Sequence, residues 1–97
     1  MLGEIESSMT LLTRLTLNFQ KGKGTMGQIA MCKAHISRVG RDVCRTAREI
    51  QGANGILWEN KTIKHMIDME GCHTGEGTYD VNVLVSAREL TGLAAFK

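Results

Sequence analysis

The chain has 97 residues, of which 42% are apolar, 4% are aromatic and none is proline. A chain of this length builds one domain with a modest core, and this composition favours helices packed through aliphatic and methionine side chains over a β-sheet. Because the net charge is only +2 and no apolar run approaches about 18 residues, we expect neither a nucleic-acid partner nor a membrane span.

The first half of the chain carries two apolar patterns of helical spacing. The first predicts a helix over residues 2 to 20, ended by a pair of glycines. Its apolar positions are Ile5, Met9, Leu12, Leu15 and Phe19. The second predicts a longer helix over residues 26 to 51, with Thr25 as its N-cap and Gly52 as its stop. Its apolar stripe runs through Ile29, Cys32, Ile36, Val39, Val43, Ala47 and Ile50.

Another face of the longer helix is rich in arginine. Four arginines recur one turn apart with two acids nearby, namely Arg38, Arg41, Arg45 and Arg48 with Asp42 and Glu49. One interpretation is a surface for an anion or an acidic partner, nucleic acid included. The other is an ordinary solvated helix face, which the interleaved acids favour.

The second half of the chain predicts two more helices. A shorter one covers residues 60 to 72, and its inward positions are Ile63, Met66, Ile67 and Glu70. The last covers residues 78 to 96, with Thr78 as N-cap and an apolar surface broad enough to imply burial against several neighbours. Four antiparallel helices with short connections predict an all-α fold, an up-down four-helix bundle that forms a single domain over residues 1 to 97.

Between these last two helices, Glu76 lies between two glycines. Glycine removes side-chain bulk and permits positive φ, so this carboxylate can approach a ligand closely. A general base needs a carboxylate held close to its substrate with water excluded. The alternative is an exposed acid on a glycine loop, stabilised by the helix N-terminus that follows.

Two segments together resemble a known family. Gly75-Glu76-Gly77-Thr78 is similar to Tyr-Glu-Gly-Thr, and Gln51-Gly52-Ala53-Asn54-Gly55-Ile56 is similar to Leu-Gly-Gly-Asn-Gly-Ile at the matching distance upstream. Both motifs belong to the C-terminal helical domain of the acyl-CoA dehydrogenase family, in the glutaryl-CoA dehydrogenase and short-chain acyl-CoA oxidase-like branch. The resemblance covers essentially the whole chain, which is similar to about the last quarter of a family member.

The resemblance implies a function and a set of site residues. Glu76 would remove the α-proton of a short acyl-CoA thioester while the β-hydrogen leaves as hydride to FAD, and Gly77 would contact the substrate. Thr78 and Asp80 would contact the flavin cofactor, and Phe96 would lie near it. The turn that approaches the flavin of a neighbouring subunit comprises Gln51, Gly52, Ala53, Asn54 and Gly55. Two residues depart from the family pattern, because Gly75 replaces tyrosine and Ala53 replaces glycine.

The resemblance also implies partners. The N-terminal helical and central β-domains have no counterpart in these residues, so we expect a homo-oligomer or a partner chain that supplies the missing domains, and an isolated chain that is inactive alone. A mitochondrial matrix, a peroxisome or a bacterial cytoplasm would suit such an enzyme. The alternative is a non-enzymatic helical bundle used for oligomerisation or partner binding.

Three histidines and three cysteines raise the question of a metal site. No Cys-x-x-Cys or His-x-x-x-His pair occurs, so we expect none. The odd cysteine count favours a reducing compartment over a disulfide framework.

Overall fold

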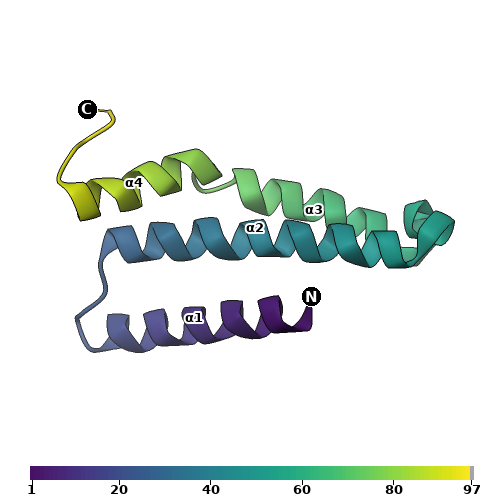
Figure 1. Ribbon diagram of the computed structural model, residues 1–97, viewed down its shortest axis with the longest axis horizontal. Helices are drawn as coiled ribbons and strands as arrows, with labels where there is room; N and C mark the ends of the chain where they lie inside the picture. Colours follow the sequence, from purple (N-terminus) through teal and green to yellow (C-terminus); the bar gives the residue numbers. More distant parts are fainter. Residues whose placement is uncertain (97) are drawn as a thin grey trace.

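The computed structural model describes residues 1 to 96, and these residues form helices without β-strands. The elements are α1 (Leu2–Gln20), α2 (Met26–Ile50), two short 3₁₀ turns η1 (Gly52–Ile56) and η2 (Trp58–Asn60), α3 (Thr62–Thr74) and α4 (Tyr79–Thr91). Figure 1 shows them in sequence colours. The predicted all-α fold with four helices is confirmed.

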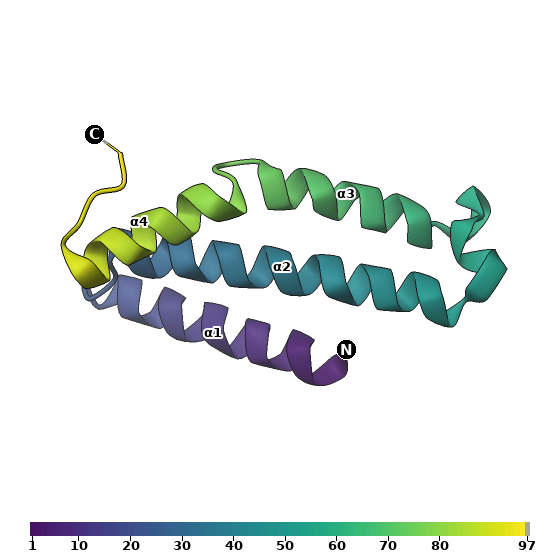
Figure 2. The same ribbon diagram turned by 45° about the horizontal axis from the view of Figure 1, so that its top comes forward.

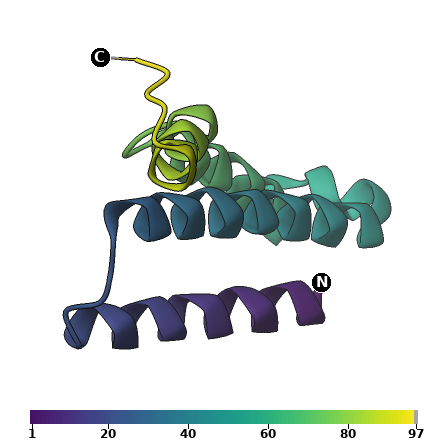
Figure 3. The same ribbon diagram turned by 60° about the vertical axis from the view of Figure 1, so that its left-hand side comes forward.

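Helix α2 is the centre of the arrangement. It contacts α1 on one side and both α3 and α4 on the other. Helices α3 and α4 follow one another along α2, and both run antiparallel to it (Figures 1 and 2). The loop between α3 and α4 shifts the chain sideways but does not reverse its direction. The described residues therefore form three rows of helices, namely α1, α2, and α3 followed by α4, in a slab of 48 × 29 × 17 Å. Figure 3 shows α1 and α4 on opposite sides of α2.

Capping explains where the helices begin. Thr25 caps α2 as predicted: its hydroxyl accepts from the Gln28 N–H, and the Gln28 side chain accepts from the Thr25 N–H. The hydroxyl of Thr78 likewise accepts from the Val81 N–H at 3.3 Å and starts α4. Both caps were predicted from the sequence.

Two predicted boundaries are wrong. The last helix ends at Thr91 and not at Phe96, because Gly92 adopts a left-handed conformation (φ 75°) and its N–H bonds to the Arg88 carbonyl at 2.8 Å. Helix α3 begins two residues later than expected, because η2 and a left-handed Lys61 (φ 59°) precede it.

The core of the described residues is small. Its buried apolar side chains are Ala30, Cys32 and Ala34. The accessible surface is 7013 Å², against about 5,500 Å² for a compact monomer of this mass. Leucines at positions 90, 93 and 2 are 82%, 77% and 73% exposed. A slab one helix thick gives each helix few neighbours, so much of its apolar surface stays open.

This shape also corrects part of the predicted packing. Ile67, expected to face inward, is 56% exposed, and Glu70 is exposed as well. Glu70 nevertheless faces α2, where its carboxylate pairs with Arg41 at 2.8 Å. Within the described residues, no helix combines the length and the apolarity needed to cross a membrane.

Candidate functional site

The loop between α3 and α4 holds the predicted base in an unusual conformation. Glu76 has φ 55° and Gly77 has φ 91°, so two successive residues occupy the left-handed region. For a non-glycine residue this conformation costs about 1–2 kcal/mol. Such residues persist where the surrounding structure holds them, and they cluster at functional sites. Glu76 is exposed in this structure.

Two side chains hold this loop from outside. The Lys33 ammonium, from α2, donates to the His73 carbonyl at 3.0 Å and also to the Gly77 carbonyl. The Asn82 amide, from α4, donates to the carbonyls of Gly77 and Thr78 at 2.8 and 2.9 Å. The Gly77 carbonyl therefore accepts two hydrogen bonds, which fixes the Gly77–Thr78 peptide, one residue after Glu76.

The end of α3 is anchored by a histidine. His73 Nδ1 lies 3.1 Å from the hydroxyl of Ser37, and that hydroxyl lies 3.2 Å from the Ala34 carbonyl. Which of the two groups donates between Ser37 and Nδ1 depends on the tautomer of His73. The ring of His73 stacks on Tyr79, with centroids 5.4 Å apart and planes 21° apart. This pair joins the two ends of the loop.

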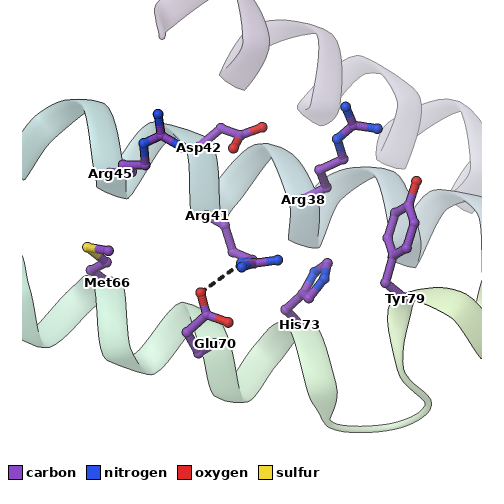
Figure 4. A pocket seen from close by; sticks show the side chains of 8 residues that line it. All are labelled: Arg38, Arg41, Asp42, Arg45, Met66, Glu70, His73 and Tyr79. Carbon is purple, nitrogen blue, oxygen red and sulfur yellow. Dashed lines mark hydrogen bonds and ion pairs between the residues drawn. The ribbon is translucent and has the colours of Figure 1, made fainter.

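A pocket of about 340 Å³ lies beside this aromatic pair. Figure 4 shows that it is lined from α2 on one side and from α3 and the start of α4 on the other. Its lining comprises Arg38, Arg41, Asp42, Arg45, Met66, Glu70, His73 and Tyr79. Arg41 Nε and Glu70 Oε1 are 2.8 Å apart, and Arg45 pairs with Glu49 at 3.3 Å. Acids on α2 and α3 therefore offset much of the charge of the arginine-rich face.

The predicted cofactor turn lies elsewhere. Gln51 and Gly52–Gly55 follow the C-terminal end of α2, whereas the Glu76 loop lies opposite Lys33. Eighteen residues of α-helix separate Lys33 from Gln51, which is roughly 27 Å. The structure does not bring the turn and Glu76 together. Within the turn, a Cβ on Gly55 would come 2.3 Å from the Arg48 carbonyl oxygen, so this position requires glycine.

The remaining predicted residues are exposed. Ala53, Asn54, Thr78 and Asp80 are open to solvent, and Phe96 is 52% exposed beyond the end of α4. The carbonyl of Asn54 accepts from the Asn60 amide at 2.7 Å, which ties η1 to η2.

Sequence reasoning missed three residues of this site, namely Lys33, Ser37 and Asn82. The first two lie on α2 and are far from Glu76 in sequence. Only the antiparallel packing of α2 along the α3–α4 junction places them there. Asn82 carried a weak local signal, because an amide in the first turn of a helix can bond to the backbone that precedes it.

The fold and loop define an all-α domain in which one glutamate is held at a helix junction. This chain belongs to the acyl-CoA dehydrogenase family: residues 1–91 match the family model described as acyl-CoA dehydrogenase, C-terminal domain. Two crystal structures of glutaryl-CoA dehydrogenase from Mycobacterium smegmatis are similar. One has a TM-score of 0.92 and 30% identity, and the other, in complex with FADH2, has 0.90 and 29%. Each match covers 97% of this chain and 24% of the other, so this chain spans about a quarter of those proteins.

Proposed function

We propose that this chain is the C-terminal domain of a flavin-dependent acyl-CoA dehydrogenase that acts on short, glutaryl-CoA-like thioesters, with Glu76 as the base. The observation that supports this most strongly is the left-handed conformation of Glu76, in the segment that resembles the family motif, with the Gly77 carbonyl after it held by Lys33 and Asn82. A residue without a function would be expected to relax, or to be glycine.

In this proposal, Glu76 accepts the α-proton of the thioester on a carboxylate oxygen. Gly75 and Gly77 on either side present no side chain, so the acyl chain can approach the carboxylate closely. A base works when it lies within hydrogen-bond distance of the proton that it removes. The Gly77–Thr78 peptide, held one residue after Glu76, limits where the glutamate side chain can reach.

The start of α4 fits the pyrophosphate of FAD. The Thr78 hydroxyl accepts from the Val81 N–H, and the Thr78 carbonyl accepts from the Asn82 N–H. The N–H groups of Tyr79 and Asp80, at the positive end of the helix, have no hydrogen-bond acceptor among the described residues. Thr78 and Asp80 would therefore hold the cofactor here, beside Gly77 as a substrate contact. When FAD is bound, its isoalloxazine ring supplies the acceptor for the β-hydride.

The rest of the site would come from outside these residues. Glu76 is exposed, and a general base of this kind works where water is excluded. The Gln51–Gly55 turn, roughly 27 Å along α2 from Lys33, would serve FAD bound to a neighbouring copy, and Phe96 would pack near a flavin. The exposed apolar side chains of α1 and α4 would be covered by the missing domains and by other copies.

A hybrid protein tests this function. These 97 residues would replace the matching quarter of the Mycobacterium smegmatis enzyme, and its flavin content and absorption would be measured with glutaryl-CoA and with a longer acyl-CoA. We expect stoichiometric FAD and loss of the oxidised flavin band with glutaryl-CoA. The proposal would be contradicted by a soluble hybrid that contains no FAD, or by one whose flavin absorption changes with neither thioester.

The second candidate is a non-enzymatic bundle that associates through its apolar faces. The observation that favours it is the large open apolar surface, which includes Leu90 and Leu2. It predicts that the chain forms oligomers with no dependence on added FAD or acyl-CoA. Ultracentrifugation with and without these ligands tests the association of the chain, and the flavin content of the hybrid protein separates the two candidates.

A further inference from the structure

We propose that Lys33 is a positioning residue for Glu76: its ammonium holds the loop in the conformation that presents the carboxylate. This inference rests on the proposed function of Glu76 as the base. It adds a residue from a distant part of the chain that neither loop motif contains.

The geometry places one ammonium across the loop. Lys33 Nζ donates to the His73 carbonyl, three residues before Glu76, and to the Gly77 carbonyl, one residue after it. The five residues from His73 to Gly77 are thereby closed by a single donor on a different helix. Helix α2 is the central rod of the fold and contacts every other α-helix, so it gives this donor a rigid support.

The chemistry of the two acceptors suits a cation. The His73 carbonyl belongs to the last turn of α3, where carbonyls lack an intrahelical donor and the helix dipole is negative. The Gly77 carbonyl already accepts from the Asn82 amide. An ammonium has three donors and can serve both carbonyls at once, and its charge strengthens both hydrogen bonds.

Without this donor the loop would lose its main contact with α2. Asn82 would still hold the Gly77 and Thr78 carbonyls, so the start of α4 would remain folded. Glu76 would be free to leave the left-handed region, because no donor on α2 would fix the carbonyls of His73 and Gly77 that flank it. The carboxylate would then occupy several positions, and only a fraction of molecules would have it aimed at the α-proton.

The test uses Lys33→Met, Lys33→Arg and Lys64→Met in the hybrid enzyme. Methionine keeps an unbranched apolar chain of nearly the same length as lysine and removes its donors. Arginine keeps the charge and has donors for both carbonyls. Lys64 lies on α3 in an exposed pair with Asp68 and serves as the control. Steady-state kinetics and amide exchange of residues 74 to 78 are measured on each variant.

We expect Lys33→Met to lower kcat by about 10- to 100-fold, since a small misplacement of a catalytic group has this effect. KM should change by less than about threefold, because binding of the thioester does not depend on the orientation of the Glu76 carboxylate. Exchange in the loop should accelerate. Lys33→Arg should recover most of the lost kcat, and Lys64→Met should behave as the wild type.

Three outcomes would overturn the inference. Full kcat in Lys33→Met, with Glu76→Gln inactive, would leave the base in place and reject the role of the lysine. Equal losses in Lys33→Met and Lys33→Arg, with global loss of exchange protection, would show a merely structural lysine. Unchanged loop exchange in Lys33→Met of the 97-residue chain would contradict the tether itself. If Glu76→Gln retains full activity, the proposed function fails first and separately.

Discussion

The carboxylate of Glu89, near the end of α4, closes the first turn of α2: its Oε2 accepts from the Gly27 N–H at 2.8 Å, and its Oε1 accepts from the Thr25 hydroxyl. A negative group is stabilised at the positive end of a helix. The Lys33 contact holds the loop before α4, and this contact holds the C-terminal part of α4 on α2.

We expect Glu89→Ala to lower the free energy of unfolding by about 1–2 kcal/mol, because hydrogen bonds to charged groups contribute this much and these are partly exposed. Gly27→Ala should be destabilising as well, since its Cβ would come 2.5 Å from the Glu89 carboxylate. Urea unfolding followed by circular dichroism measures both. The double variant should lose less than the sum of the two, because the alanine at 27 no longer meets a carboxylate.

Glu59→Ala, in the exposed η2 turn, is the matched control and should stay close to the wild type. If Glu89→Ala behaved like this control, the carboxylate would not hold α2 and α4 together. Strict additivity of the two substitutions would likewise reject the close contact.

Adjacent positions in the loop should respond in opposite directions. Glu76→Gly relieves a left-handed non-glycine residue, so we expect unchanged or slightly higher stability, by up to about 1 kcal/mol. Gly77→Ala should cost about 1–2 kcal/mol, because φ is 91° there and a Cβ would lie 3.0 Å from the Asn82 amide nitrogen. Thermal unfolding compares the two variants. A clear loss of stability in Glu76→Gly would mean that the glutamate is there for folding.

Thiol reactivity should follow burial. Cys32 is buried and Cys72 is exposed, and burial raises the pKa of the Cys32 and Cys44 thiols above the ordinary value of 9.0. The thiolate is the reactive form, so Cys72 should be alkylated first at neutral pH. Mass spectrometry after timed iodoacetamide treatment identifies the order, and Cys72→Ser is the control. Fast labelling of Cys32 in the native chain would contradict its placement in the core.

The same shifts give a pH dependence. The unfolded thiols ionise near their ordinary pKa, whereas the folded ones stay protonated to higher pH. The stability linked to them is therefore complete below about pH 9 and is lost as pH rises beyond it. Urea midpoints between pH 7 and pH 10 measure this loss, which should shrink in Cys32→Ala.

The helices and their N-caps could be predicted because they depend on local signals. Apolar spacing defined α1 and α2, and hydroxyls at positions 25 and 78 marked two starts. The end of α4 was missed because Gly92 interrupts a segment whose apolar pattern continues to Phe96. The Glu76 loop was found through its flanking glycines and its resemblance to a family motif. Its supports were not found, because Lys33 reaches the loop only through the packing of α2 against α3 and α4.

Packing was the harder part for the same reason. The apolar stripes were correctly placed on helices, yet Leu90 and Ile50 remain 82% and 71% exposed. Periodicity indicates which face of a helix is to be buried, but it carries no information on which part of an assembly covers that face. Here only one row of helices flanks α2 on each side, so much of the apolar surface of α1, α3 and α4 remains exposed to solvent.

The most direct test of the central claim compares wild-type, Glu76→Gln and Glu76→Asp hybrids by stopped-flow absorption of the flavin after mixing with glutaryl-CoA. Glutamine keeps the shape of the side chain but cannot accept the proton, and aspartate accepts it from a position one methylene shorter. We expect rapid bleaching in the wild type, slower bleaching in Glu76→Asp, and a persistent oxidised band in Glu76→Gln with its FAD retained. Bleaching of Glu76→Gln at the wild-type rate would show that another group removes the proton.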